Sequence, residues 1–326
     1  MKKALVTGAG GFIGHHLVRL LLERGVETAC FLRYTSTSSP GLLSTLPKHL
    51  AGGLSTFYGD IRDPDAVGKA AAGCDTIFHL AALIGIPYSF RSPRDVVSVN
   101  VGGTLNVLEA ARETGARLLV TSTSEVYGTA TRVPITEEHG LHAQSPYAAS
   151  KTAGDQLALS YHCAYGLPVT VCRPFNTYGP GQSQRAVIPT IITQALRGGA
   201  CIELGSTDPT RDLLFVTDTA SGFVELSQCP EATGMVVQLG TGSEISIRDL
   251  AGVILRILGR EDIEIRTTQE RKRPEGGEVM RLVASAALAE RLTGWRPGVS
   301  LEEGLRITAE WIGNHPDLYP LRGYMI

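Results

Sequence analysis

A tyrosine and a lysine four residues apart are the first candidates for chemistry in this sequence. Tyr147 and Lys151 lie in the segment YAASKTA, which is rich in helix-forming residues. On a helix, residues four apart project from the same face. A cation beside a phenol favours the phenolate, so Lys151 should lower the phenol pKa from its ordinary value of about 10. Tyr147 is therefore predicted to act as a general base or acid, with Lys151 as its electrostatic partner.

Hydroxyl and carboxyl side chains follow the predicted buried strand Arg117–Thr121. Doubly wound folds place their chemistry at the carboxyl ends of their strands. Thr123, Ser124 and Glu125 are therefore candidates for the same site. A surface helix would explain the tyrosine–lysine spacing by itself. It would not explain that spacing beside a hydroxyl-rich strand end and a glycine motif.

The glycine motif GAGGFIG lies between a short β-rich run, Lys3–Thr7, and a predicted helix, His16–Arg24. Strand, glycine turn and helix form the context in which such a motif binds a dinucleotide. Its glycines let the backbone turn tightly and approach a pyrophosphate at the helix N-terminus. The predicted cofactor-binding residues of this loop are Gly8, Gly11, Phe12, Ile13 and Gly14.

The end of the predicted second strand, Thr28–Leu32, bears on the choice of cofactor. An acidic residue there would bind both ribose hydroxyls and disfavour a 2′-phosphate. This chain has Arg33 and three hydroxyl-bearing residues ending at Ser36 instead. Arg33 could bind a 2′-phosphate, or it could stack on adenine in an NAD enzyme. The pattern favours NADP(H) over NAD.

Further cofactor contacts are predicted at the ends of the next strands, Leu54–Tyr58 and Asp75–His79. An acid and an apolar side chain that follow the first strand suit the adenine amino group and its flat face. Small residues after the second strand let a cofactor lie close, whereas His79 itself is expected to be packed and hydrogen-bonded. The residues are Asp60, Ile61, Leu80, Ala81 and Ala82, and Asn100 in the predicted long helix Pro93–Thr114 is a further polar anchor.

The order of these elements predicts an α/β chain with a Rossmann-type doubly wound parallel sheet in residues 1–175. The alternation of strands and helices becomes irregular in residues 176–326, although some later segments are expected to return to the first domain. This second region is predicted to be a smaller α/β unit that binds the substrate. Arginines recognise phosphates bidentately, and Arg211 and Arg273 lie in it.

Composition excludes several classes of protein. The chain has 326 residues, 43% hydrophobic residues and a formal charge of −2, which describes a globular protein without the basic excess of a nucleic-acid binder. No apolar run is long enough to cross a membrane. Six scattered cysteines without a C-x-x-C motif indicate buried thiols in a reducing cytoplasm and no metal site.

With these residues in place, the chain resembles the extended short-chain dehydrogenase/reductases that act on nucleotide-diphosphate sugars. The resemblance covers almost the full length through TGAGGFIG, GDIRD, HLAA, NVGGT, STSEVYG, YAASK, RPFNTYGPGQ, RAVIP and RDLLFVTD. It implies that Thr123, Tyr147 and Lys151 carry an oxidation step with a tightly bound, recycled NAD(P). It also implies that Asn176, Val187, Arg211 and Arg273 hold the nucleotide diphosphate, and that Ser124 contacts the sugar.

Within this superfamily the chain is most similar to bacterial sugar-nucleotide 4,6-dehydratases, including the UDP-N-acetylglucosamine type. The subclass depends on Glu125, because elimination of water requires a carboxylate that removes the C5 proton, and 4-epimerases usually lack one there. Many 4,6-dehydratases have Asp-Glu where this chain has Ser124-Glu125. GDP-mannose dehydratases and UDP-glucuronate decarboxylases share the Ser-Glu pair, so a decarboxylase and a 4-epimerase remain alternatives, with a non-catalytic cofactor sensor a remote one.

A homodimer is also expected, because Pro93–Thr114 and Ala149–Tyr165 resemble the two helices that pair across dimers in this superfamily. Their apolar faces are the direct support in the sequence, and packing inside one chain would explain these equally well.

Overall fold

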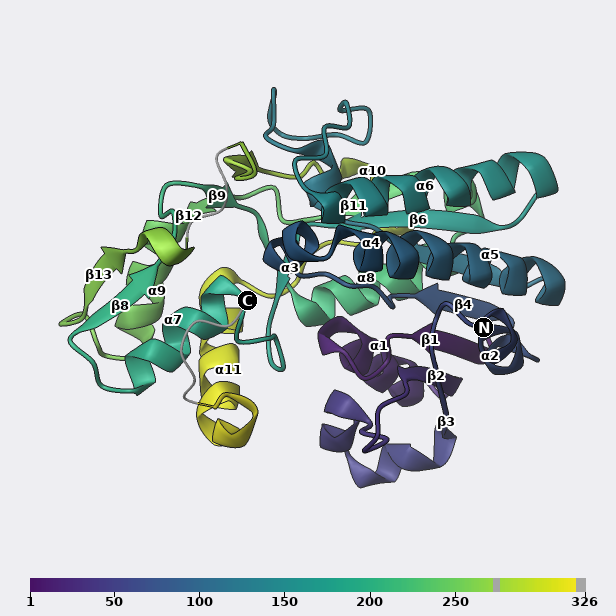
Figure 1. Ribbon diagram of the computed structural model, residues 1–326, viewed down its shortest axis with the longest axis horizontal. Helices are drawn as coiled ribbons and strands as arrows, with labels where there is room; N and C mark the ends of the chain where they lie inside the picture. The colour runs from purple at the N-terminus through teal and green to yellow at the C-terminus, as the bar shows by residue number, and fades with distance from the viewer. Residues whose placement is uncertain (272–275, 321–326) are drawn as a thin grey trace.

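A seven-stranded parallel sheet forms the centre of the molecule in the computed structural model, which describes residues 1–271 and 276–320 (Figure 1). The strand order places β1 and β4 side by side, where the direction of winding reverses, so the fold is the predicted doubly wound sheet. In sheet order the strands are β11 (Val236–Leu239), β6 (Val169–Pro174), β5 (Arg117–Thr121), β4 (Thr76–His79), β1 (Lys3–Thr7), β2 (Glu27–Arg33) and β3 (Leu54–Gly59).

Helices cover both faces of the sheet because successive strand side chains point to opposite sides. In β1, Val6 packs into one hydrophobic cluster and Leu5 into another. The first cluster is covered by α1 (Phe12–Glu23), α8 (Val216–Gln228) and α10 (Ala287–Thr293). The second is covered by α2 (Pro64–Ala71), α5 (Gly103–Thr114) and α6 (Pro146–Tyr165).

The helix predicted at Pro93–Thr114 is not continuous. It divides into α4 (Pro93–Val97), a π-helical turn at Ser98–Gly102, and α5. Such turns insert one residue into a helix and frequently occur at functional sites. Here the turn places the buried side chain of Asn100 against the chain that follows β4.

Two other helices begin earlier than the sequence pattern indicated. The helix predicted from His16 begins at Phe12, since Gly11 is its N-cap and the glycine loop leads directly into its first turn. The helix predicted from Ala149 begins at Pro146. There the Ser145 side chain accepts a hydrogen bond from the Ala148 N–H, and proline is favoured in a first turn.

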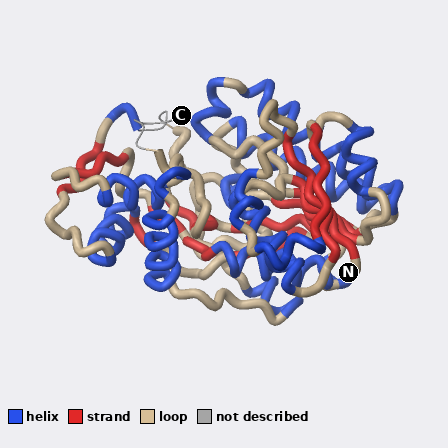
Figure 2. The backbone as a smooth tube through the Cα atoms, turned by 90° about the horizontal axis from the view of Figure 1, so that it is seen from below, coloured by secondary structure: helices blue, strands red, loops and turns tan. Residues whose placement is uncertain are grey.

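The later part of the chain forms a smaller lobe with its own core, on the left of Figure 1 and apart from the large sheet in Figure 2. Its helices are α7 (Val187–Leu196), α9 (Ile247–Ile257) and α11 (Leu301–Asn314), beside the parallel pair β8 (Cys201–Leu204) and β13 (Glu264–Thr267). Small sheets join β7 (Asn176–Tyr178) to β10 (Leu213–Phe215), and β9 (Thr210–Arg211) to β12 (Ile245–Ser246) and β14 (Arg281–Leu282).

Strand β11 and helix α8 come from beyond residue 175 and pack with the large sheet. The boundary between a cofactor domain and a substrate domain stays a prediction. On that division, β11 and α8 belong with the cofactor domain. Within the described residues, the helices are all too short or too polar to cross a membrane.

Candidate functional site

The carboxyl end of β5 presents a hydroxyl and a carboxylate side by side. Thr123 caps a short 3₁₀ turn, Ser124–Tyr127, and its Oγ1 accepts a hydrogen bond from the Glu125 N–H at 3.2 Å. Ser124 and Glu125 are both buried. A buried carboxylate is costly unless it is paired or used in chemistry, which makes Glu125 a candidate for a functional group.

Helix α6 brings the tyrosine and lysine to the same place. Tyr147 lies in its first turn and Lys151 one turn later, and both are buried, at 8% and 6% exposure. The Tyr147 hydroxyl makes a hydrogen bond with Thr123, and the carboxylate of Glu125 acts on it electrostatically. The structure therefore assembles Thr123, Glu125, Tyr147 and Lys151 into one cluster.

The expected lowering of the Tyr147 pKa is wrong. Burial raises the pKa of this phenol well above its ordinary value, and the charges of Glu125 and Asp155 raise it further, while the hydrogen bond with Thr123 lowers it. Removal of the phenol from water opposes phenolate formation more strongly than its neighbours favour it. A base at Tyr147 thus depends on additional positive charge beside the phenol.

Lys151 is the cation that the chain supplies there. Burial lowers the pKa of its ammonium to about 8, and the charge of Asp155 acts in the opposite direction. The ammonium therefore remains mostly protonated at neutral pH, but its pKa lies only about one unit above that pH.

The glycine loop forms a cradle that fits a dinucleotide. Gly8 has a φ of +72°, and a Cβ there would lie 2.9 Å from the Ala81 backbone nitrogen. A Cβ on Gly14 would lie 2.3 Å from the Gly8 carbonyl oxygen. Gly11 caps α1 without any side-chain hydrogen bond, so the N–H groups of the first turn, which includes Phe12 and Ile13, can face an anion.

The chain after β4 is held in place by two hydrogen-bonded side chains. His79 contacts the Thr7 hydroxyl at 2.9 Å with one ring nitrogen and the Thr104 hydroxyl at 3.0 Å with the other. It is buried and packed, as expected. Asn100 accepts a hydrogen bond from the Leu83 N–H at 2.7 Å and donates to the Leu83 carbonyl oxygen and to Ser150.

These bonds occupy both amide hydrogens of Asn100, so its main observed role is to fix the loop Leu80–Leu83 against α6. Leu80, Ala81 and Ala82 are half-buried in that loop. Their direct contact with a cofactor, and that of Asn100, stays a prediction.

The residues predicted near the adenosine end lie after β2 and β3. Arg33 and Ser36 are exposed. The Asp60 carboxylate accepts hydrogen bonds from the Arg62 guanidinium, which lowers its pKa to about 2 despite opposition from partial burial; Arg33 lowers it slightly further. Ile61 is buried against Gly103 of α5.

The predicted phosphate-binding residues belong to the later part of the chain. Asn176 opens β7, and its Oδ1 is buried without a hydrogen-bond partner among the described residues, so it can accept one from a ligand. Arg211 is buried and forms an ion pair with Glu278 at 3.1 Å. Val187 begins α7, whereas Arg273 lies outside the described residues.

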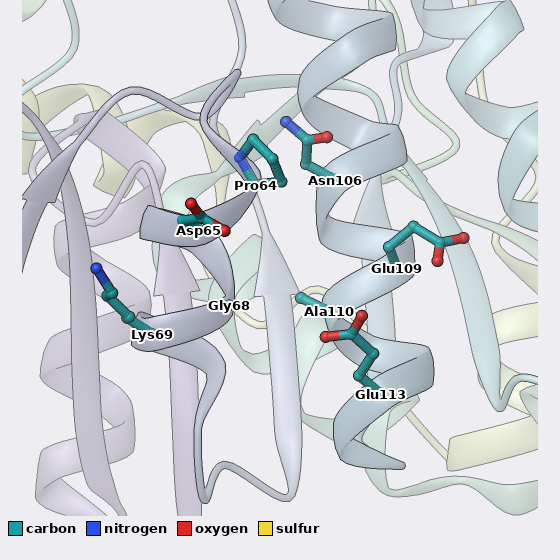
Figure 3. A pocket seen from close by; sticks show the side chains of 8 residues that line it. All are labelled: Pro64, Asp65, Gly68, Lys69, Asn106, Glu109, Ala110 and Glu113. Carbon is teal, nitrogen blue, oxygen red and sulfur yellow. The ribbon is translucent and has the colours of Figure 1, made fainter.

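A groove of about 370 Å³ lies elsewhere, between α2 and α5, with Asp65 and Lys69 on the α2 side and Glu109 and Glu113 on the α5 side (Figure 3). Glu109 bonds to Tyr161, which lies 14 residues beyond Tyr147 on α6, or about 21 Å at the helical rise. The groove is therefore separate from the cluster. No group of three metal-ligating side chains occurs within residues 1–271 and 276–320.

Asp155 and Arg173 adjoin the cluster, and the sequence reasoning missed both. Asp155 lies one turn beyond Lys151 on α6, and its carboxylate forms a buried ion pair with Arg173 at 2.9 Å. The spacing Tyr-x-x-x-Lys-x-x-x-Asp was the available signal for Asp155. The pairing of Asp155 on α6 with Arg173 on β6 had no such signal.

Comparison with known proteins identifies the family. The model of the GDP-mannose 4,6 dehydratase family matches residues 5–308. The chain belongs to this family. It is an extended short-chain dehydrogenase/reductase and, like its relatives, an enzyme of nucleotide-sugar chemistry with a nicotinamide cofactor.

Relatives in this family differ in their reactions. The chain is 34% identical to a dTDP-glucose 4,6-dehydratase of Streptomyces griseus, over 95% of this chain and 94% of the relative. It is 35% identical to a UDP-glucose 4-epimerase of Mycolicibacterium smegmatis, over 96% and 99%. A solved dTDP-glucose 4,6-dehydratase, a DesIV double mutant of Streptomyces venezuelae with NAD and DAU bound, matches with a TM-score of 0.89 and 32% identity, over 98% and 99%.

The geometry of the cluster generates a first prediction. Tyr147→Phe removes the phenolic hydroxyl and keeps the packing, so the variant should fold and retain cofactor while turnover falls by a factor of at least ~10². Steady-state kinetics beside cofactor content checks this. Tyr161→Phe, on the same helix but in contact with Glu109, is the control. Near-normal turnover by the Tyr147 variant would rule out its role.

Proposed function

We propose that this enzyme is a nucleotide-sugar 4,6-dehydratase. The observation that carries the proposal is the buried carboxylate of Glu125, which lies beside Thr123 and acts electrostatically on Tyr147. An epimerisation at C4 needs hydride and proton transfer at that carbon alone. Dehydration also needs a base that removes the C5 proton and an acid that protonates the departing C6 oxygen.

Oxidation of the sugar at C4 is assigned to Tyr147 and its neighbours. Tyr147 acts as its phenolate: oriented by Thr123, the phenolate takes the proton of the C4 hydroxyl, and the positive charge of Lys151 stabilises that phenolate. The glycine loop and the N-terminus of α1 hold the dinucleotide. When bound, its nicotinamide supplies the redox chemistry, accepting a hydride from C4 and returning it at C6.

Elimination is assigned to Glu125. The 4-keto group acidifies the C5 proton, Glu125 removes it, and the same group, now protonated, can protonate the C6 hydroxyl as it leaves as water. Ser124, which precedes Glu125 in the 3₁₀ turn, is proposed to contact the sugar. One carboxyl group then serves both proton transfers of the elimination, and C5 regains a proton from solvent, relayed by Glu125, when the hydride is delivered to C6.

UDP-N-acetylglucosamine or a similar nucleotide-diphosphate hexose is the proposed substrate. The Oδ1 of Asn176, which has no partner among the described residues, suits a hydroxyl donor of the ligand, and the buried guanidinium of Arg211 suits an anionic group. Val187 and Arg273 complete the proposed contacts with the nucleotide. The N-acetylhexosamine rests on the motif resemblance alone.

A second prediction separates dehydration from its alternatives. Glu125→Gln should block elimination but permit the first oxidation, because Tyr147 is unchanged. Reduced nicotinamide should then accumulate, visible by absorbance, and the C5 proton should not exchange with heavy water. The wild-type product should weigh one water less than its substrate.

Mass spectrometry of wild-type products from a panel of nucleotide sugars gives the controls. An unchanged mass with inversion at C4 would identify an epimerase, and loss of carbon dioxide from a glucuronate would identify a decarboxylase. Either result contradicts the proposal.

A third prediction concerns the cofactor. We propose that the enzyme accepts NADP(H), since Arg33 is exposed at the end of β2 and no acid stands there to exclude a 2′-phosphate. The cofactor released by denaturation and identified by mass should include NADP. Arg33→Ala should weaken NADP binding more than NAD binding, whereas Arg19→Ala, in the middle of α1, should change neither. Release of NAD alone from the wild type would refute this.

A fourth prediction concerns assembly. We propose a homodimer through α4–α5 and α6, where Val97, Leu105 and Tyr165 are 49%, 40% and 60% exposed. Light scattering should give twice the mass of the 34.7 kDa chain. Leu105→Arg should shift it toward monomer, while Ile307→Arg on α11, also at an exposed apolar position, should not. A wild type that is monomeric at working concentration contradicts the proposal.

A further inference from the structure

Helix α6 carries a third ionisable residue on its buried side. Tyr147, Lys151 and Asp155 follow one another at four-residue steps, so that each lies about one turn beyond the last. Their exposures are 8%, 6% and 0%. A carboxylate is therefore buried one helical turn from the catalytic ammonium.

The two oxygens of Asp155 have different surroundings. Its Oδ2 accepts hydrogen bonds from Ser122 Oγ at 2.9 Å and from Arg173 Nε at 3.0 Å, and it forms an ion pair with Arg173 Nη2 at 2.9 Å. Its Oδ1 is buried and has no hydrogen-bond partner among the described residues. A buried charged oxygen without a partner is costly, which indicates that it has an electrostatic use.

Arg173 cannot move to satisfy that oxygen. Its Nη1 donates to the Tyr127 hydroxyl at 3.0 Å, and its guanidinium lies over the Tyr127 ring at 5.0 Å. Tyr127 in turn donates to Gln238 Oε1 at 3.1 Å, and Gln238 Nε2 donates to the Ile135 and Ser285 carbonyl oxygens. This chain of bonds fixes Arg173, and through it the carboxylate of Asp155.

We propose that Asp155 is a positioning residue whose carboxylate is shared as counter-ion between Arg173 and Lys151, and that it keeps the Lys151 ammonium charged beside Tyr147. Arg173 anchors one oxygen, which leaves the charge of the other for Lys151. The consequence for turnover rests on the proposed function, whereas the electrostatic coupling itself does not. Burial lowers the Lys151 pKa to about 8, and Asp155 opposes this fall.

Other ionisable groups around Lys151 come from α6, β4, β6 and the turn after β5. Burial lowers the pKa of His79 to about 3 and raises that of the Cys172 thiol, so both are neutral near pH 7. The groups are Tyr147 and Asp155 of α6, His79 of β4, Glu125 and Tyr127 of the turn after β5, Cys172 and Arg173 of β6, and Glu137 beyond Gln238. Asp155 is the carboxylate among them that acts on Lys151 directly.

Direct titration of Lys151 tests the coupling. The chain has six lysines, so protein labelled with ¹³C at the lysine ε-carbon gives few NMR signals, and Lys151→Arg assigns the one that matters. The protein is used as purified, with its bound cofactor. The pKa of Lys151 is then compared in the wild type, in Asp155→Asn and in Arg173→Gln.

The two variants should move this pKa in opposite directions. Asp155→Asn removes the counter-ion and should lower it by about one unit or more, and Arg173→Gln removes the competing cation and should raise it. Ser122→Ala, which removes a hydrogen bond but no charge, should leave it nearly unchanged. If Asp155 only held Arg173 in the fold, both variants would lose stability and the Lys151 pKa would stay the same, which would overturn the proposal.

If Asp155→Asn fails to fold, Arg173→Gln still tests the coupling. That variant keeps the Asp155 carboxylate, the hydrogen bond that it accepts from Ser122, and Lys151 one turn away. No rise in the Lys151 pKa in that variant would also overturn the proposal. Product analysis remains independent of this result. A shifted Lys151 pKa in an enzyme that does not release water would support the coupling and refute the dehydratase assignment.

Discussion

The close approach of two strand ends, after β1 and after β4, is the constraint on which the rest of the structure depends. A Cβ on Gly8 would lie 2.9 Å from the Ala81 nitrogen, so a side chain at that position would separate the two segments. The contact sets the position of the N-terminus of α1 at the carboxyl edge of the sheet. Because β5 is the next strand beyond β4, Thr123 and Glu125 reach the same edge.

Burial then determines the electrostatics of the cluster. The same loss of water that raises the pKa of Tyr147 lowers that of Lys151, so each group is pushed toward its neutral form. Catalysis by a phenolate therefore requires that the positive charge be maintained at Lys151. A carboxylate one turn away, anchored by Arg173, is a direct way to maintain it. We therefore propose that Asp155 and Arg173 belong to the ionic arrangement that supports Lys151.

Much of the fold could be predicted from local patterns. Strands β1 to β5 each lie within one residue of a predicted strand, because parallel strands covered on both faces are recognisable by their composition. The break in the helix at Asn100 could not be predicted, since it depends on bonds to Leu83 and Ser150 from other parts of the chain. The direction of the Tyr147 pKa was wrong for a similar reason: spacing identifies the neighbouring charge but not the burial.

The sequence by itself determined the family, the doubly wound fold and the grouping of hydroxyl, carboxyl, phenol and ammonium groups, because these follow from short spacings and from strand ends that meet at one edge. Only the tertiary structure decided that Asp155 pairs with Arg173, that Asn100 serves the loop after β4, and that Tyr147 is held neutral. Those outcomes depend on contacts between distant segments and on exclusion of water. Neither the contacts between distant segments nor the exclusion of water can be read from the spacing of residues along the chain.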